Sequence, residues 1–363
     1  MRTDTHAADQ KYLVVLEGWR LGAKNPAGVA DCSLIVPTYK RPREAQEQIE
    51  NLCRLPDFPA EVLFIDSSPD DATEEALLAA SKQQELPFHL IYVKSPKGLT
   101  LQRNVGVDIS TKDLLFFLDD DAFPRPGYFQ VMRDALAPAE SQGIAAAGAC
   151  IINEINKPIA GRWRFRRALH LIPRSEPYRY NHVASSAPSG LLKQFSGLRD
   201  VDIFQGGACA IRREVFETER FSEFFQGYAY GEDVEMSMRV RRRWRVVMCG
   251  DAHIFHRGTS STVGGRPDGF IKGKMEVINR HFIWNRYSSR SSFLNRVRLY
   301  LDFMLILTMD LAWFCAKPTR LNSIRHAVGI AAGVFETLIS PTKYQEPPVT
   351  RRYRLAVDSA AEK

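Results

Sequence analysis

The sequence predicts an α/β fold with a mostly parallel sheet flanked by helices, followed by a helical C-terminal extension. Between residues 33 and 118, short apolar runs without polar interruption alternate with segments of helical periodicity. This alternation is typical of repeated β-α units, which build a parallel sheet with helices on both faces. Beyond about residue 270 the chain instead has a helical and basic character.

Four apolar runs predict strands that are buried on both faces. They comprise residues 34 to 36, 62 to 65, 90 to 93 and 114 to 118. Helices are predicted between them, because apolar residues recur at helical spacing and Pro or Asp lies near the helix starts. These helices span residues 43 to 54, 70 to 84 and 100 to 110.

The chain becomes irregular from about residue 145 to 200, where Arg, Pro and aromatic residues are frequent. We interpret this segment as a candidate substrate loop. Short strands are predicted over residues 208 to 211 and 246 to 248. Between these strands, a helix is predicted to open after Gly231 and to continue to Trp244.

The composition is that of an ordinary globular protein, with 45% hydrophobic and 25% charged residues among 363. It excludes collagen-like, coiled-coil and polytopic membrane proteins. The six cysteines are scattered without a Cys-x-x-Cys pair, so neither a zinc knuckle nor a disulfide framework is encoded. Because the N-terminus also lacks the layout of a signal peptide, we expect a cytoplasmic protein.

The net charge of +7 is concentrated at the C-terminal end of the chain. Residues 270 to 363 hold 15 Lys and Arg residues against 7 Asp and Glu residues, so the remaining chain is near neutral. A near-neutral body argues against a nucleic-acid groove, and we expect no nucleic-acid partner. The basic tail fits either an anionic surface, such as the inner face of the plasma membrane, or a solvated helix face.

An apolar stretch from Leu299 to Ala316 is interrupted by Asp302 and Asp310. Charges at such a depth make a membrane-spanning helix costly, which disfavours a span. The two Asp residues would fall on one broad face of a helix that is otherwise apolar. Packing in the core and association with a membrane surface both remain open for this helix.

The most informative feature is Asp119-Asp120-Asp121, which directly follows an apolar strand. Three adjacent carboxylates repel one another unless a cation or an array of donors compensates their charge. Carboxylate oxygens suit Mg²⁺ or Mn²⁺, and in an extended segment Asp119 and Asp121 would face one side and Asp120 the other. The alternative is a helix N-cap with additional solvated acids, because Pro124 and Pro126 mark a helix entrance nearby.

A second acidic pair, Glu232-Asp233, follows a glycine at the start of a predicted helix. The helix dipole stabilises ionised carboxylates there, and an oriented Asp can deprotonate an alcohol that attacks an electrophile. Simple N-capping is the alternative. His256 follows a strand and is a candidate metal ligand, whereas His253 would point to the opposite face.

Together these segments resemble the family 2 glycosyltransferases of GT-A fold, which are inverting enzymes that use nucleotide-sugar donors. The resemblance covers about residues 32 to 260 and rests on motifs in the family's order. The motifs are Val36-Pro37-Thr38-Tyr39 with Arg41, Phe64-Ile65-Asp66-Ser67-Ser68, Lys97-Gly98 to Arg103-Asn104-Val105-Gly106, Asp119 to Asp121, Gly206-Gly207, Glu232-Asp233 and His256. The second motif is commonly Asp-Asp/Asn-Gly-Ser, so here the leading Asp is retained and the turn differs.

The resemblance implies a role for each matching residue. Asp66 would bond the pyrimidine ring of a UDP- or dTDP-sugar. The residues implied in the remaining donor site are Pro37, Tyr39, Arg103, Asn104, Asp119 and Asp120. Asp121 and His256 would hold Mn²⁺ or Mg²⁺, and Asp233 would be the catalytic base with Glu232 beside it. The residues expected on the acceptor side are Gly206, Gly207 and Trp163, the last of these from its place in the irregular segment.

The same resemblance divides the chain into an N-terminal extension (1–30), a Rossmann-like GT-A catalytic domain (31–268) and a basic helical region (269–363). Within the domain, residues 31 to 122 would bind the nucleotide and residues 123 to 268 the acceptor. The expected enzyme is a non-processive hexosyltransferase of bacterial cell-surface polysaccharide synthesis, because the stretch before Trp244 lacks the Gln of a QxxRW motif. The acceptor would be a glycan or a lipid-linked glycan. A sugar-1-phosphate nucleotidyltransferase and a non-catalytic protein that binds membrane surfaces remain as alternatives.

Overall fold

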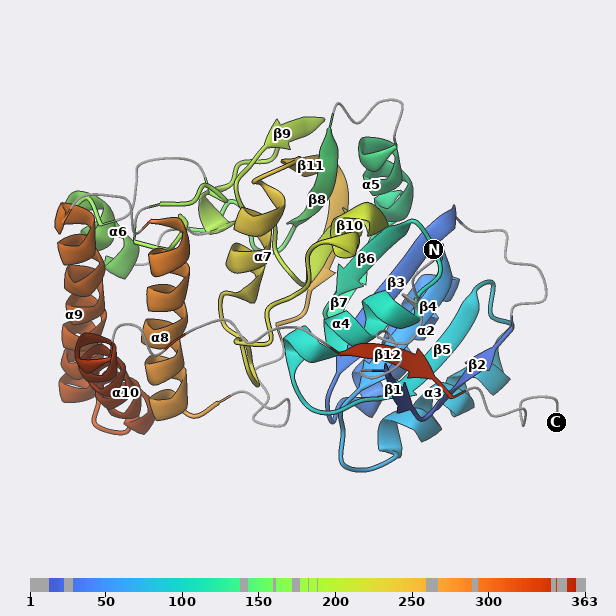
Figure 1. The fold of residues 1–363 in the computed structure, drawn as a ribbon, viewed down its shortest axis with the longest axis horizontal. Helices are drawn as coiled ribbons and strands as arrows, with labels where there is room; N and C mark the ends of the chain where they lie inside the picture. Colours follow the sequence, from blue (N-terminus) through green and yellow to red (C-terminus); the bar gives the residue numbers. More distant parts are fainter. Residues whose placement is uncertain are drawn as a thin grey trace, which may run out of the picture.

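The computed structural model describes residues 13–22, 29–137, 143–158, 161–171, 177–181, 183–187, 189–258, 267–288, 293–340, 344 and 351–356. Over these residues, a ten-stranded sheet with flanking helices forms the body of the protein. Helices from the C-terminal third stand together at one end of this body (Figure 1). The predicted α/β fold is therefore confirmed.

The first half of the sheet is parallel, as expected from the four apolar runs. Its strands are β3 (Val29–Thr38), β4 (Pro59–Asp66), β5 (His89–Lys94) and β6 (Leu114–Leu118). The helices that connect them are α2 (Pro42–Cys53), α3 (Ala72–Gln83) and α4 (Leu99–Ile109). Every residue of β4 and β6 is buried, since apolar clusters pack on both faces of the sheet.

The second half of the sheet is mixed, so the sheet is parallel over a smaller part than the sequence predicted. The added strands are β7 (Ala122–Pro124), β8 (Ile144–Ile151), β9 (Leu198–Asp200), β10 (Ala208–Arg212) and β11 (Arg245–His256). β8 and β9 lie within the segment predicted to be irregular, so that prediction is wrong for these residues. The chain then continues as β10, which runs antiparallel between β6 and β8. β11 is parallel to β8 and antiparallel to β7 and β9.

Shorter elements complete the body of the protein. They are α5 (Tyr128–Leu136), α6 (Gly161–Ala168), α7 (Glu232–Val240), and the 3₁₀ turns η2 (Ser189–Leu191) and η3 (Arg213–Glu217). α7 begins where the glycine predicted it but ends at Val240, and turn residues then lead to β11 instead of a continued helix.

Short strands near both ends of the chain were missed by the sequence analysis. β2 (Gly18–Leu21) pairs antiparallel with β5 and forms an edge of the large sheet. β1 (Leu13–Leu16) pairs in parallel with β12 (Arg352–Leu355), so segments from both ends lie side by side (Figure 1). The expected N-terminal extension thus adds a strand to the sheet, and the C-terminal region is not helical throughout.

The C-terminal region contains three helices that pack on one another. They are α8 (Gly269–Tyr287), α9 (Phe293–Ala316) and α10 (Leu321–Ile339). A buried cluster that includes Phe225, Phe282 and Phe303 joins these helices to the segment before α7. Among the described residues, α9 is the helix whose length and hydropathy would suffice to cross a membrane, and 17% of its apolar window is buried.

Candidate active site

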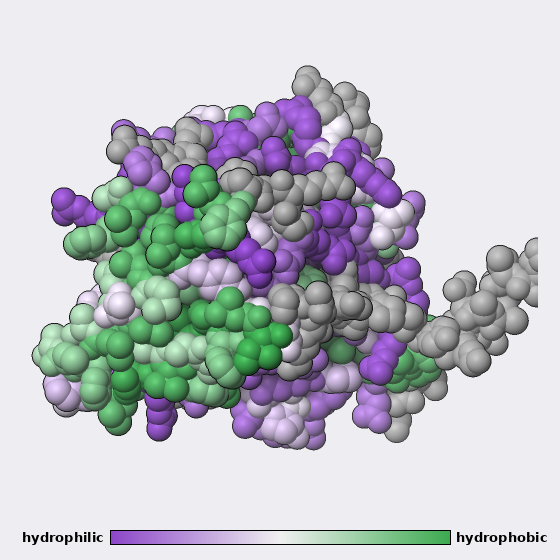
Figure 2. All heavy atoms as spheres, turned by 60° about the vertical axis from the view of Figure 1, so that its left-hand side comes forward, coloured by the Kyte–Doolittle hydropathy of each residue, from purple (hydrophilic) through white to green (hydrophobic). Residues whose placement is uncertain are grey.

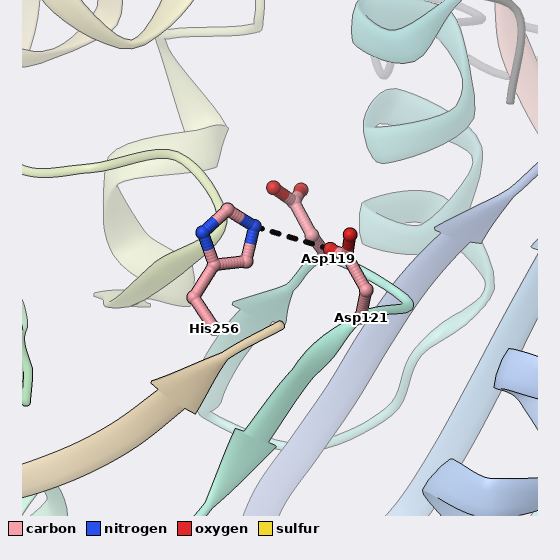
Figure 3. A group of neighbouring side chains, drawn as sticks. All are labelled: Asp119, Asp121 and His256. Atoms are coloured by element: carbon pink, nitrogen blue, oxygen red, sulfur yellow. Dashed lines mark hydrogen bonds and ion pairs between the residues drawn. The ribbon is translucent and has the colours of Figure 1, made fainter. Parts of the chain in front are cut away.

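Two carboxylates and an imidazole converge where β6 and β11 end. A turn closed by the Ala122 N–H on the Asp119 carbonyl oxygen, at 3.0 Å, follows β6. His256 pairs with Ala122 across β7 and β11, which brings its ring beside the turn. The His256 Nε2 atom lies 3.1 Å from Asp121 Oδ1, and one ligand atom of each of Asp119, Asp121 and His256 lies within 4.8 Å of the others (Figure 3).

Asp120 points away from this cluster, as the alternation of an extended segment predicts. Its Oδ2 atom accepts a hydrogen bond from Thr38 Oγ1 at 3.0 Å, and its Oδ1 atom lies 2.5 Å from Arg41 Nη1. Burial raises the pKa of Asp120 to about 7, although Arg41 opposes that shift. Asp120 therefore ties the turn to the end of β3, while Arg41 also reaches Asp121 at 3.3 Å.

Glu154, from the turn after β8, holds the other side of the His256 ring. Its Oε1 atom lies 2.9 Å from His256 Nδ1. The hydrogen bonds of Asp121 and Glu154 raise the pKa of His256 to about 10. Such a carboxylate fixes the ring orientation and tautomer of a metal-binding histidine. Glu154 carries no sequence motif, and only the parallel pairing of β8 with β11 brings it to the site.

The cluster of Asp119, Asp121 and His256 fits a divalent cation by its chemistry. Two carboxylates supply the hard oxygen ligands that Mg²⁺ and Mn²⁺ prefer, and an imidazole is accepted by Mn²⁺. The Asp119 side chain is 41% exposed, so one side of the cluster is open to a substrate. The same acids without a cation repel one another, which is a cost that a bound ion relieves.

The second acidic pair lies at the N-terminus of α7, behind Gly231 in a left-handed conformation (φ 87°). Asp233 accepts a hydrogen bond from the Val234 N–H at 2.8 Å, and burial raises the pKa of Asp233. Glu232 is bound by Arg103 Nη1 at 2.5 Å. Burial and the adjacent Asp233 raise the pKa of Glu232 against the effect of Arg103.

Because Gly206 and Gly207 have no side chains, there is room for Asp119 and Glu232 beside them. A Cβ atom on Gly207 would lie 2.3 Å from Asp119 Oδ2. A Cβ atom on Gly206 would lie 2.7 Å from Arg103 Nη1 and 2.8 Å from Glu232 Oε1. Contacts this short do not occur, so any side chain here would displace the acidic residues. The two glycines thus determine the geometry of the site in addition to lining its cavity.

Two cavities meet at the cluster of Asp119, Asp121 and His256. The smaller, of about 190 Å³, is lined by Pro37, Thr38, Tyr39, Arg41, Ser67, Lys97, Gly98, Leu99, Gln102, Asp119, Asp120, Asp121, Gly227, Tyr228 and His256. The larger, of about 630 Å³, contains both acids of the second pair, both glycines and Trp163 in its wall. Asp119 and His256 line both cavities, so a cation between them would contact molecules in each.

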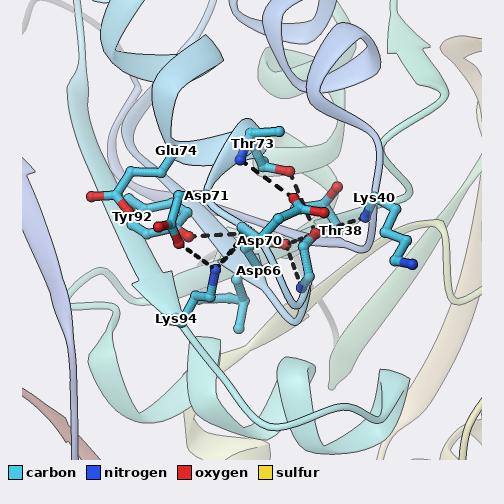
Figure 4. A network of polar contacts seen from close by, with 12 residues as sticks. Thr38, Lys40, Asp66, Asp70, Asp71, Thr73, Glu74, Tyr92 and Lys94 are labelled. Carbon is cyan, nitrogen blue, oxygen red and sulfur yellow. Dashed lines mark hydrogen bonds and ion pairs between the residues drawn. The ribbon is translucent and has the colours of Figure 1, made fainter.

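Three of the expected donor residues lie outside the smaller cavity. Asp66 is fully buried and accepts hydrogen bonds from the Ser68 N–H at 2.9 Å and from the Tyr92 hydroxyl at 3.0 Å (Figure 4). Ser67 lines the cavity in its place. Arg103 lines the larger cavity and pairs with Glu232, and Asn104 is buried against the backbone of Phe221.

Gln102 and Lys97, to which the sequence analysis gave no role, support the same cavity. Gln102 donates hydrogen bonds to the carbonyl oxygens of Thr38 at 2.9 Å and Ile65 at 2.6 Å, which joins the ends of β3 and β4. Lys97 stacks over the Tyr39 ring at 4.2 Å. Gln102 lies one position before the predicted Arg103, on the face of α4 that meets the sheet ends.

Trp163 comes from α6, in the irregular segment, and reaches the larger cavity. The Arg166 guanidinium stacks on its ring at 4.2 Å. Arg166 in turn binds both oxygens of Asp302 on α9, at 2.6 and 2.5 Å. A residue of the C-terminal helices therefore holds the predicted acceptor residue, which no local sequence pattern indicates.

Comparison with known proteins finds glycosyltransferases among the similar proteins. Residues 33 to 219 match the family described as Glycosyl transferase family 2. An uncharacterized glycosyltransferase, YwdF of Bacillus subtilis, is 28% identical over 108 residues, which cover 30% of this chain and 39% of that protein. The succinoglycan biosynthesis protein ExoM of Rhizobium meliloti is 26% identical over 249 residues, covering 59% of this chain and 79% of that protein. The chain thus spans less than half the length of the Bacillus relative.

A solved structure of similar fold is the mannosyltransferase PcManGT from Pyrobaculum calidifontis, in complex with GDP-Man and Mn²⁺. The TM-score is 0.51 at 15% sequence identity, and the alignment covers 87% of this chain and 89% of that chain. The family match covers more than half of this chain. The chain belongs to glycosyl transferase family 2, and its fold is similar to that of PcManGT.

Proposed function

We propose that the protein is a metal-dependent inverting transferase that moves a sugar from a UDP- or dTDP-sugar to a hydroxyl of a glycan or glycolipid. The observation that carries this proposal is the position of Asp119 and His256 in the walls of both cavities. A donor in one cavity and an acceptor in the other would then meet at the cation. The similarity to a succinoglycan biosynthesis protein supports a role in cell-surface polysaccharide synthesis.

The smaller cavity is proposed to hold the nucleotide. Pro37 and Tyr39 at the end of β3 would flank the base, and Ser67 would lie beside its imide edge. Uracil and thymine share that edge, so both fit. Asp66 would act by holding the Ser67 loop, since Ser68 and Tyr92 occupy its oxygens. Arg103 and Asn104 would support the site from α4.

Asp121 and His256 are proposed to hold Mn²⁺ or Mg²⁺ with Asp119. The related fold of PcManGT was solved with Mn²⁺ and a nucleotide sugar, which supports this assignment. When bound, the cation would neutralise the charge that develops on the leaving diphosphate. Asp120 would keep the turn in place through Thr38 and Arg41.

Asp233 is proposed to be the base. Asp233 lines the larger cavity. Because burial raises its pKa, the Asp233 carboxylate accepts a proton more readily than a fully solvated carboxylate does. The acceptor oxygen forms its bond to the anomeric carbon as the bond to the diphosphate oxygen breaks, and the acceptor proton passes to Asp233. One displacement from the opposite face inverts the configuration. Glu232 would hold Arg103 beside Asp119.

We further propose that the enzyme works in the cytoplasm at an anionic membrane surface. α9 and α10 carry exposed apolar residues, and Figure 2 shows apolar side chains gathered where the C-terminal helices come forward. The acids Asp302, Asp310 and Glu336 of these helices are each engaged by a neighbouring cation. The exposed cations Arg296, Lys317, Arg320 and Arg325 would therefore set the charge of that face.

Thermal unfolding with Mn²⁺ and a panel of UDP-, dTDP- and GDP-sugars tests the reaction. We expect one metal and nucleotide pair to stabilise the wild type. Asp121→Asn is expected to abolish that stabilisation, because a metal ligand is lost. Asp233→Asn is expected to retain it and to lose transfer by a factor of about 10² to 10⁴. Metal-independent nucleotide binding, or transfer that survives Asp233→Asn, would contradict the proposal.

A further inference from the structure

The larger cavity has two chemically different ends. Asp119, Glu232 and Asp233 lie in its wall at the sheet, where the proposed reaction takes place. Its wall also includes the apolar Leu305, Ile306, Met309 and Trp313, which lie on successive turns of α9, beside the ion pair of Asp310 with His326. The proposed reaction itself, which occurs between hydroxyl and diphosphate groups, has no need of an apolar wall on this helix.

The apolar end of the cavity adjoins the exposed surface of α9. Trp313 belongs to the cavity wall and is 41% exposed. Leu301, Met304 and Leu311 on the same helix are also exposed, although they do not line the cavity. An apolar molecule that lies against α9 would therefore extend from the cavity toward the surface that Figure 2 shows as apolar.

The wall between the two ends is held by buried ion pairs. Asp302 is fully buried and binds Arg166 on α6 and Arg280 on α8, the latter at 2.6 Å. Arg280 also lies 3.4 Å from Glu276 Oε1. Arg166, Glu276 and Arg280 line the cavity, so α6, α8 and α9 are fixed around it. The cavity is thus a built feature between the C-terminal helices and the catalytic body.

We infer that the acceptor is an amphiphile, a glycan joined to a lipid chain. Its reacting hydroxyl would lie at Asp233, with the sugar near Trp163, and the lipid chain would lie against Leu305, Ile306, Met309 and Trp313. This inference rests on the proposed function and narrows its acceptor from any glycan to a lipid-linked one. A free glycan would leave the apolar end of the cavity in water, whereas a lipid chain buries it.

The test uses a series of alkyl β-D-glucosides and β-D-galactosides of increasing chain length, below their micelle concentrations. Binding is measured by calorimetry with Mn²⁺ and UDP present. We expect affinity for the wild type to rise by about three- to fourfold for each methylene that reaches the apolar wall. Ile306→Gln with Met309→Gln is expected to abolish this dependence on chain length.

The matched control is Phe335→Gln with Leu338→Gln, which changes exposed apolar residues of α10 that do not line the cavity. This pair is expected to keep the chain-length dependence of the wild type. Absence of that dependence in the wild type, or its equal loss in both variant pairs, would overturn the inference. Mn²⁺-dependent nucleotide binding, measured in each variant, verifies folding. It also separates a failure of this inference from a failure of the proposed function, because the donor cavity lies on the other side of Asp119.

Discussion

At the scale of single residues, the site depends on a chain of contacts that runs from Glu154 through His256 to Asp121. The imidazole lies between two carboxylates, at 2.9 Å on Nδ1 and 3.1 Å on Nε2. If His256 is a metal ligand, the hydrogen bond to Glu154 leaves Nε2 free of a proton and directed at the cation. Glu154 is then a positioning residue that acts through His256.

Glu154→Gln tests this role. We expect the affinity for Mn²⁺ to fall by about 10- to 100-fold, because the ring loses the carboxylate that orients it and raises its basicity. Mn²⁺ titration followed by electron paramagnetic resonance measures the change. Glu85→Gln, an exposed acid in the turn after α3, is the matched control and is expected to leave the affinity unchanged. Unaltered Mn²⁺ affinity in Glu154→Gln would assign Glu154 a purely structural role.

At the scale of elements, two acidic residues within the apolar sequence of α9 bind this helix to its neighbours. Asp302 binds Arg166 and Arg280, and Asp310 binds His326 of α10 at 2.6 Å. Loss of one partner of a buried ion pair costs about 3 to 5 kcal/mol, because the other charge is left without compensation. These contacts explain how a helix with the length and hydropathy of a membrane span packs against the body of the protein.

His326 gives this helix packing a pH dependence. Hydrogen bonds with Asp310 and Glu276 raise the pKa of His326 from 6.5 to about 9. A raised pKa in the folded state means that the stabilisation is complete below pH 6.5, declines as the pH rises and is lost above about pH 9. We therefore expect thermal unfolding midpoints of the wild type and His326→Gln to differ most at pH 6 and to converge above pH 9. A difference that is constant from pH 6 to 9.5 would contradict this assignment.

At the scale of the whole molecule, charge and apolar surface coincide on the C-terminal helices. The net charge of +7 arises from residues 270 to 363, whereas the rest of the chain is near neutral. Phe293, Leu321 and Phe335 are each more than half exposed on the same helices. This combination is typical of proteins that lie on an anionic membrane surface, where cations and inserted apolar side chains both contribute to binding.

Lys317→Glu with Arg320→Glu tests the orientation of the molecule on such a surface. We expect binding to vesicles containing about one third phosphatidylglycerol to weaken by roughly fivefold for each cation, and more at low salt than at high salt. Co-sedimentation measures the change. Arg43→Glu with Lys82→Glu, on α2 and α3 at the sheet, is the matched control and is expected to have a smaller effect. Equal weakening by both pairs would indicate attraction by net charge alone.

The sequence by itself determined the elements of the parallel half of the sheet and the order of the chemistry along the chain, but it missed β8 in the segment predicted to be irregular. The apolar runs of β4 and β6 and the helical spacing between them are local patterns, so their bounds were predicted closely. The acidic triplet, the pair at α7 and His256 were also found, because carboxylates at the ends of buried strands and helices are conspicuous. β2 and β12 were missed, since four-residue strands at an edge carry little periodic signal.

Only the tertiary structure decided which of these residues meet. Strand pairing between β7 and β11 places His256 beside Asp121, and pairing between β8 and β11 brings Glu154 to the same ring. Asp66, which was predicted to contact the nucleotide, is instead buried in the structure and supports its own loop. Asp302 likewise binds Arg166, which joins α9 to α6 at the larger cavity. Such contacts join residues up to 136 positions apart, and no local pattern encodes a distance of that kind because it is set by packing of the whole chain.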